Sequence, residues 1–295
     1  MRVGMNLLLW TMHVTEAHFP VLARLKQVGF DGVEVPLSHG DGTHYRAVRR
    51  ELDNLGLACT TALVEDPVAN AISPDPAVRK AAVERQRWAI EMTAVLGGGI
   101  LNGEFHTPRL PPTGQVEEER MRAADVFRQT AEIARLVGVH LAIEYLNRFE
   151  SYFLTTAADT RSLVKRVDHS NFGMMYDTFH AHIEEKDPTA AIAAAAEDLI
   201  HVHISENDRG IPGTGQVRWS ETFGALRRVG YDGWLTIESF SRAMPDLAAA
   251  MRIWRDVFPE PDDVSTQGVR FIRKQWAAAG EPAQASSQLD LRQTR

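Results

Sequence analysis

The stretches KQVGFDGVEV (residues 26–35) and RRVGYDGWLTIE (residues 227–238) nearly repeat one another, although they lie near opposite ends of the 295-residue chain. In each stretch a helical pattern ends at Val-Gly, a short turn with Asp-Gly follows, and an apolar run typical of a β-strand begins. Such a recurring junction is expected when one helix-to-strand geometry repeats around a closed sheet.

The rest of the chain alternates in the same way between short apolar runs and longer amphipathic stretches. A strand followed by a helix, eight times over, predicts parallel pairing, an α/β class and a single-domain (β/α)8 TIM barrel. The strand-like runs are residues 3–9, 32–36, 57–64, 99–103, 139–145, 172–177, 200–205 and 234–239. The barrel should cover residues 1–279, and the polar residues 280–295 should form a poorly ordered tail. A doubly wound sheet would carry a glycine-rich turn after its first strand, whereas this turn reads LLLWTMHVTEAH.

Composition restricts the classes of function. Hydrophobic residues make up 44% of the chain, and its formal net charge is -7. Because nucleic-acid binding needs clustered Lys and Arg, this charge favours a small-molecule partner over DNA or RNA. No apolar segment is long enough to span a bilayer. The opening MRVGMNLLLW is too short and too interrupted for a signal peptide, and the single Cys59 has no disulfide partner, so we predict a cytoplasmic protein.

Four consecutive predicted strands end with, or carry near their ends, a side chain that can bind a metal. In a TIM barrel the chemistry lies at the carboxyl ends of the strands. The residues there are Glu144, Asp177, His203 and Glu238, spaced by about one strand-helix unit each. Three carboxylates would repel one another without a countercharge, so we expect a divalent cation. Oxygen donors with one imidazole favour Mn²⁺, Mg²⁺ or Co²⁺.

Each of these residues also has a simpler interpretation. A single acid at a strand end often caps the next helix, and a buried histidine is often a satisfied core residue. It is the joint spacing that favours a metal site. The glycines in 97–99 and 213–215 lack the order of a phosphate-binding loop, so we interpret both stretches as turns. Trp10 and Phe105, near the ends of the first and fourth predicted strands, would either wall a substrate pocket or pack in the core.

Four blocks of the sequence resemble the ketose 3-epimerases, the D-tagatose and D-psicose 3-epimerase group of xylose isomerase-like TIM barrels. The blocks are IEYLNRFESYFLTT (143–156), MMYDTFHAHIEEKDP (174–188), HVHISENDRGIPGTGQVRW (201–219) and IESFSR (237–242). They occur in the family's order, and the resemblance extends to about residue 279.

The resemblance implies a metal-dependent isomerase that inverts C3 of a free ketose through an enediolate. The four strand-end residues would hold one divalent ion per chain, with Mn²⁺ expected first and Co²⁺ or Mg²⁺ as alternatives. Glu144 and Glu238 would also be the catalytic acid-base pair. The substrate-binding residues that carry over are Glu150, His180 and Arg209.

The substrate stays open at the level of sequence, because the family's aromatic cluster in strand one is only partly reproduced in MNLLLWTMH. The superfamily also holds hydroxypyruvate isomerases, inosose dehydratases and pentulose-phosphate epimerases. The few basic residues in the loops favour free sugars over phosphates. An apurinic endonuclease would need a basic DNA face, and a non-catalytic sugar-binding barrel is a further alternative. The assembly is open between a homodimer and a homotetramer.

Overall fold

Eight parallel strands close into a barrel in the computed structural model of the chain, which describes residues 1–64, 68–106 and 110–280. The strands are β1 (Arg2–Asn6), β2 (Gly32–Leu37), β3 (Ala58–Leu63), β4 (Ile100–Gly103), β5 (His140–Ile143), β6 (Phe172–Asp177), β7 (Leu199–Ile204) and β8 (Trp234–Ile237). Each strand pairs with the next, and β1 closes the ring against β8 with Val3 opposite Leu235. The predicted (β/α)8 barrel is therefore confirmed.

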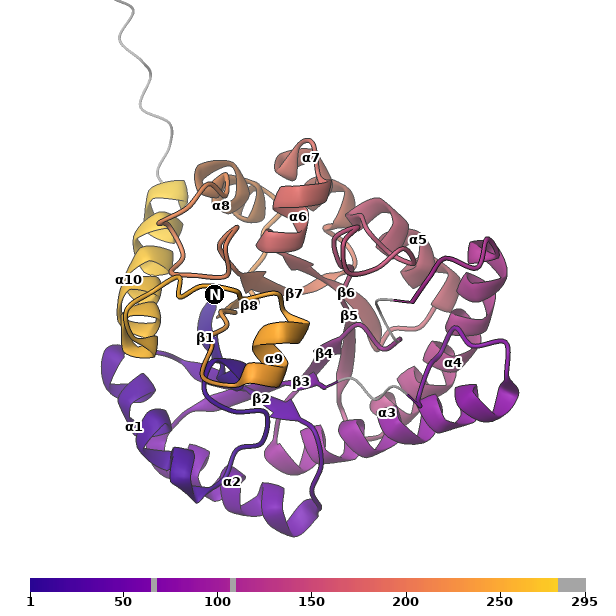
Figure 1. Cartoon of the computed structure of the whole chain (residues 1–295), viewed down its shortest axis with the longest axis horizontal. Helices are drawn as coiled ribbons and strands as arrows, with labels where there is room; N and C mark the ends of the chain where they lie inside the picture. The colour runs from indigo at the N-terminus through magenta and orange to yellow at the C-terminus, as the bar shows by residue number, and fades with distance from the viewer. Residues whose placement is uncertain (65–67, 107–109, 281–295) are drawn as a thin grey trace, which may run out of the picture.

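The longer helices form an outer ring around this barrel (Figure 1), and the chain has ten α-helices in the described ranges. They are α1 (Phe19–Val28), α2 (Gly42–Leu55), α3 (Pro76–Leu96), α4 (Val116–Leu136), α5 (Ala157–Val167), α6 (Thr178–Glu184), α7 (Pro188–Ala195), α8 (Trp219–Arg228), α9 (Pro245–Ala250) and α10 (Pro261–Gly280). Short 3-10 helices, η1 (Leu7–Leu9) and η2 (Glu16–His18), precede α1. The short α9 lies inside the ring of longer helices (Figure 1). No helix in the described ranges is both long and apolar enough to cross a membrane.

Local signals explain where the helices begin and end. The Asp41 side chain accepts the backbone N–H groups of Thr43 and His44 at the start of α2, which satisfies two otherwise unpaired donors. The same helix ends at Gly56, whose φ of 62° lies in the left-handed region that glycine adopts without strain. The start and the end of α2 are thus set by residues next to it in the sequence.

Some predicted boundaries differ from the observed ones. The first strand, expected over residues 3–9, ends at Asn6, because the Asn6 side chain accepts the N–H of Leu8 and turns the chain into η1. Strands β5 and β8 stop at Ile143 and Ile237, so Glu144 and Glu238 come directly after them. Gly280 is the last residue of α10, and the rest of the predicted tail lies outside the described residues.

The strands approach one another closely where Gly32 of β2 lies beneath Trp234 of β8. A Cβ atom at Gly32 would overlap the Ala58 carbonyl oxygen and the Trp234 ring. We therefore expect Gly32→Ala to destabilise the barrel by about 1–3 kcal/mol, measured by urea unfolding.

Gly99→Ala is the matched control, because a Cβ at Gly99 would meet no atom within 4 Å and its φ is not left-handed. The control should stay within about 0.5 kcal/mol of the parent. Equal losses in both variants would show that the close packing at Gly32 is not what makes its substitution costly.

Candidate active site

The four strand-end side chains meet at the carboxyl end of the barrel. Each of Glu144, Asp177, His203 and Glu238 is buried and offers a ligand atom within 4.8 Å of those of the other three. Asp177 and His203 are paired directly across β6 and β7. His203 Nδ1 lies 3.4 Å from Glu238 Oε1 and 3.8 Å from Asp177 Oδ2. Parallel pairing has thus turned a regular spacing in the sequence into one compact cluster.

The cluster is short of positive charge. Glu144 Oε1 and His203 Nδ1 are buried without a hydrogen-bond partner. Burial, and then the nearby Glu238, raise the pKa of Glu144 well above its ordinary value, and burial raises the pKa of Asp177 to about 6. Burial would also raise the pKa of Glu238, but the charges of His203 and Arg209 hold it at about 2. A cation among these atoms would satisfy both orphaned groups, and the donor set fits one divalent ion of the Mn²⁺, Mg²⁺ or Co²⁺ type.

The guanidinium group of Arg209 lies beside the carboxylates of the cluster. Its Nη1 donates to Asp177 Oδ2 at 3.0 Å and to Glu238 Oε2 at 2.6 Å. The side chain is 4% exposed, and its guanidinium carbon lies 3.8 Å from the centre of the Phe179 ring. Its backbone adopts a φ of 62°, which is costly for a residue with a side chain. The loop must therefore be held firmly to keep this conformation.

Glu206 supplies that support. Its buried carboxylate accepts hydrogen bonds from the loop that follows it, and the donors are the backbone N–H groups of Asn207, Gly213 and Val217 and the Trp219 Nε1–H. Gly213 has a φ of 93°, and a Cβ at this position would press against the Phe271 ring. These contacts agree with the interpretation of residues 213–215 as a turn.

His180 and Arg209 direct two donors toward one point. His180 Nδ1 accepts the backbone N–H of Asn147 at 3.0 Å, which leaves the ring proton on Nε2. This Nε2 lies 3.1 Å from Arg209 Nη2 and 3.8 Å from Glu144 Oε1. Both N–H groups can therefore donate to one acceptor oxygen placed between them. Glu150 lies alongside, where its Oε1 accepts from the Asn147 side chain at 2.9 Å.

A cavity of about 280 Å³ opens beside these groups, near the lower end of the roughly 300–1,000 Å³ usual for small-molecule sites. Its polar lining is Asn102, Glu104, Glu144, Glu150, His180, Arg209, Glu238 and Asp246. Its apolar lining is Leu8, Met12, Ala62, Leu63, Val64, Leu146, Phe240, Leu247, Ala250 and Met251. The helix α9 therefore forms part of the wall, and the predicted binding residues Glu150, His180 and Arg209 all face the cavity.

Trp10 and Phe105 do not belong to the described lining of this cavity, and their place in a pocket wall stays a prediction. Phe105 has a φ of 55°, is buried, and packs against Phe127 with ring centres 6.2 Å apart. Trp10 packs against the main core at the end of η1. Among residues near the start of the chain, Leu8 and Met12 form the wall instead.

Sequence reasoning also missed Glu34, a fully buried acid in β2 that contacts the ring of His203. The signal was weak, because a single glutamate within the run GVEVP looks like the polar member of an alternating strand. His201 lies two residues before His203 in β7, which puts both side chains on one strand face, and both rings approach Glu34.

Comparisons with known proteins point to one family. The sequence model described as xylose isomerase-like TIM barrel matches residues 22–275. A ketose 3-epimerase of Arthrobacter globiformis is 31% identical over 94% of this chain and 98% of its own length. An L-ribulose 3-epimerase of Mesorhizobium japonicum is also 31% identical, over 92% and 93%. A D-allulose 3-epimerase of Methylomonas sp., solved with D-allulose, superposes with a TM-score of 0.87 at 26% identity, covering 93% and 97%. These matches confirm the resemblance seen in the sequence.

The cluster predicts measurable metal binding. Chelated protein dialysed against Mn²⁺ should retain about one ion per chain by elemental analysis. Because the ion binds the folded state only, Mn²⁺ at about 100 times its Kd should add about 2.7 kcal/mol to the free energy of unfolding.

Asp177→Asn is the matched variant, since an amide can still cap α6 through Phe179 but supplies no charge. It should lose most of the Mn²⁺-dependent stabilisation. Three zinc ions per chain in the parent, or no change of melting temperature with any divalent ion, would contradict a single divalent site.

Proposed function

Because the chain belongs to the xylose isomerase-like TIM-barrel family, we propose that it is a divalent-metal-dependent ketose 3-epimerase that acts on free sugars. One observation carries this proposal. Two carboxylates, from the ends of β5 and β8, line one cavity and belong to the same buried cluster as the metal-type donors Asp177 and His203. The similarity to a ketose 3-epimerase and to an L-ribulose 3-epimerase supports the same reaction.

Glu144, Asp177, His203 and Glu238 would hold the ion. When bound, a divalent cation would stabilise the negative charge that develops on the oxygens next to the reacting carbon. The protein side chains then have to bind the ketose, orient it and move protons.

Inversion at C3 requires a proton to leave one face of the sugar and another proton to arrive on the opposite face. The hydrogen at C3 is acidic only because of the neighbouring carbonyl, so its removal produces an enediolate. Glu144 and Glu238 reach the cavity from strands three positions apart around the ring. One carboxylate would act as base and the other as acid, and their roles would exchange with the epimer that is bound.

The remaining polar groups would fix the carbonyl end of the substrate. His180 Nε2 and Arg209 Nη2 lie 3.1 Å apart, and both can donate to one carbonyl oxygen. Glu150, held by Asn147, would accept a hydrogen bond from the terminal hydroxyl. This arrangement keeps C3 next to the two catalytic carboxylates.

The charge of the cavity favours a free ketose. Among the described lining residues, Arg209 is the one Arg or Lys, and its guanidinium is already engaged by Asp177 and Glu238. Five carboxylates line the same cavity: Glu104, Glu144, Glu150, Glu238 and Asp246. A phosphate group would meet repulsion there without an available partner. The acidic chain likewise disfavours an endonuclease.

Manganese as the ion and a cytoplasmic location remain predictions. A homodimer or homotetramer also remains a proposal, and it is supported by two exposed aromatic residues near the cavity, Phe149 (66% exposed) and Trp254 (71% exposed). Apolar side chains this exposed often mark a protein interface.

Turnover in D₂O tests the reaction. Mn²⁺-loaded protein should epimerise at least one of D-allulose, D-tagatose and L-ribulose, with deuterium at C3 of the product and none at C1 by NMR. The proton delivered to C3 comes from a carboxyl group that exchanges with solvent, so the label must enter at that carbon. Ketose phosphates and inososes should react poorly.

Glu238→Gln removes one of the two proton carriers and should lower the exchange rate by about 10²- to 10⁴-fold, beyond any loss of bound Mn²⁺ measured in the same sample. Glu221→Gln makes the same chemical change on the exposed surface of α8 and should leave turnover unchanged. Label at C1 with an aldose product would indicate aldose-ketose isomerisation. Loss of water without inversion would indicate a dehydratase.

A further inference from the structure

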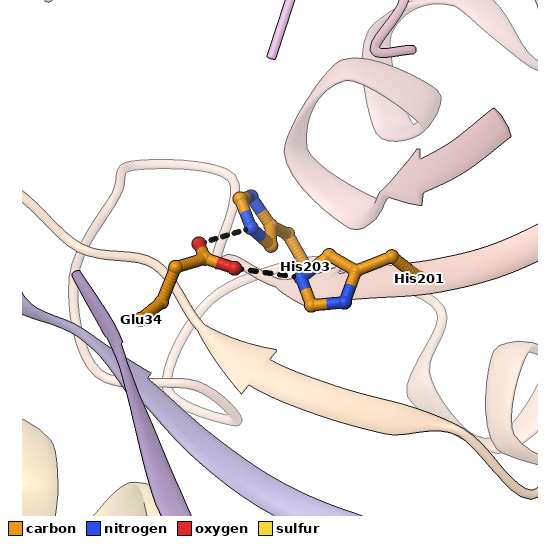
Figure 2. Close-up of side chains that lie close together, drawn as sticks. All are labelled: Glu34, His201 and His203. Atoms are coloured by element: carbon orange, nitrogen blue, oxygen red, sulfur yellow. Dashed lines mark hydrogen bonds and ion pairs between the residues drawn. The ribbon is translucent and has the colours of Figure 1, made fainter. Parts of the chain in front are cut away.

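Glu34 is a buried carboxylate in the barrel interior on which donors from four other strands converge. Its Oε1 accepts from Asn6 Nδ2 at 2.9 Å and from His203 Nε2 at 2.8 Å. Its Oε2 accepts from Thr60 Oγ1 at 2.8 Å and from Asn102 Nδ2 at 2.5 Å. The Nε2 atom of His201 lies 2.9 Å from the same Oε2. Figure 2 shows the two imidazole rings approaching the two oxygens of Glu34.

This arrangement requires an ionised Glu34. An ionised carboxylate only accepts hydrogen bonds and offers about four lone-pair positions, which suits a site surrounded by amide, hydroxyl and imidazole N–H donors. A protonated carboxyl group would have to place its own O–H against one of these donors. The Glu34 side chain is fully buried, so water cannot replace any of them.

The two ring nitrogens of His203 have different surroundings. Its Nε2–H is donated to Glu34, whereas its Nδ1 faces Glu238 Oε1 at 3.4 Å and has no hydrogen-bond partner. When the ring is neutral, a proton held on Nε2 leaves the Nδ1 lone pair free for a cation. Histidines that bind metals generally donate their other N–H to a carboxylate or carbonyl, which fixes both tautomer and ring orientation.

Glu34 is connected to a second member of the cluster through Asn6. The Asn6 amide donates to Glu34 Oε1 at 2.9 Å and approaches Glu238 Oε1 at 3.3 Å. The oxygen Oε1 therefore contacts His203 directly and is linked to Glu238 through one amide. The oxygen Oε2 accepts from Thr60 and Asn102, and His201 Nε2 lies close to it.

We propose that Glu34 is a positioning residue that holds His203 with Nδ1 aimed into the carboxylate cluster and so sets the affinity of that cluster for a divalent ion. The inference rests on the proposed metal-dependent function. It assigns to Glu34 no contact with the substrate, because Glu34 lies outside the described cavity lining.

Metal affinity tests the proposal without relying on activity. Metal-free protein is titrated with Co²⁺, followed by its visible absorption, and the thermal melting of each metal-free variant is recorded. Glu34→Gln has nearly the same shape but no charge, and it should weaken Co²⁺ binding by about 10- to 100-fold. Glu34→Asp keeps the charge but withdraws the oxygens from His203, so it should weaken binding as well. If Glu34→Gln does not fold, the Co²⁺ affinity of Glu34→Asp tests the proposal instead.

Thr60→Val is the matched control, because it removes a buried donor to Oε2 and leaves the contact between Oε1 and His203 intact. Its Co²⁺ affinity should change by clearly less than about tenfold even if its metal-free melting temperature falls as far as that of Glu34→Gln. In a His203→Asn background, Glu34→Gln should cause little further loss, since residues that act through one another are not additive.

The outcomes separate the two proposals. A parent protein that binds Co²⁺ and epimerises ketoses, with Glu34 variants that bind Co²⁺ as tightly, would overturn the positioning role alone. Equal losses in Thr60→Val and Glu34→Gln would overturn it too, because they would indicate general damage to the barrel. A parent that binds neither Co²⁺ nor Mn²⁺ would overturn both proposals.

Discussion

The gathering of buried carboxylates at one end of the barrel is the constraint on which the rest of the site depends. Parallel strands all end at the same end of the barrel. The acids that end β6 or follow β5 and β8 are therefore held close together and cannot move apart. Their repulsion has to be offset by cations in defined places. Arg209 provides one charge through its contacts with Asp177 and Glu238, and a divalent ion bound at His203 Nδ1 would provide another.

Two buried glutamates outside the cluster hold these groups in position. Glu206 gathers the backbone N–H groups of its own loop, and this loop keeps Arg209 in a left-handed conformation. Glu34 orients His203 from the barrel interior. In each case an ionised carboxylate surrounded by hydrogen-bond donors fixes both the direction and the distance of these donors, which an apolar side chain cannot do. Burying a charged carboxylate costs free energy, and hydrogen bonds from all of its donors are needed to offset that cost.

The cavity combines two surfaces of different character. The polar part of the lining includes five carboxylates, Asn102, His180 and Arg209, and one of the carboxylates is Asp246 of α9. The apolar part comes from η1, β3, α9 and the segments next to them. The polar side can recognise a carbonyl and its neighbouring hydroxyl, which every ketose has. If the substrate is a ketose as proposed, selection among sugars would fall to the apolar lining, which includes Leu8, Met12 and Leu247.

The sequence by itself determined the barrel and the four candidate ligands. Strand periodicity, caps and turn residues are local signals, and one ligand-type residue per strand-helix unit becomes one cluster once the pairing is parallel. Only the tertiary structure showed that Phe105 packs against Phe127, that Trp10 packs against the main core, and that Glu34 contacts His203. The direction of a side chain after a strand depends on single backbone angles such as the φ of Phe105, and the donors to Glu34 come from β1, β3, β4 and β7. Partnerships across a closed barrel join residues far apart in the chain, so no local pattern records them.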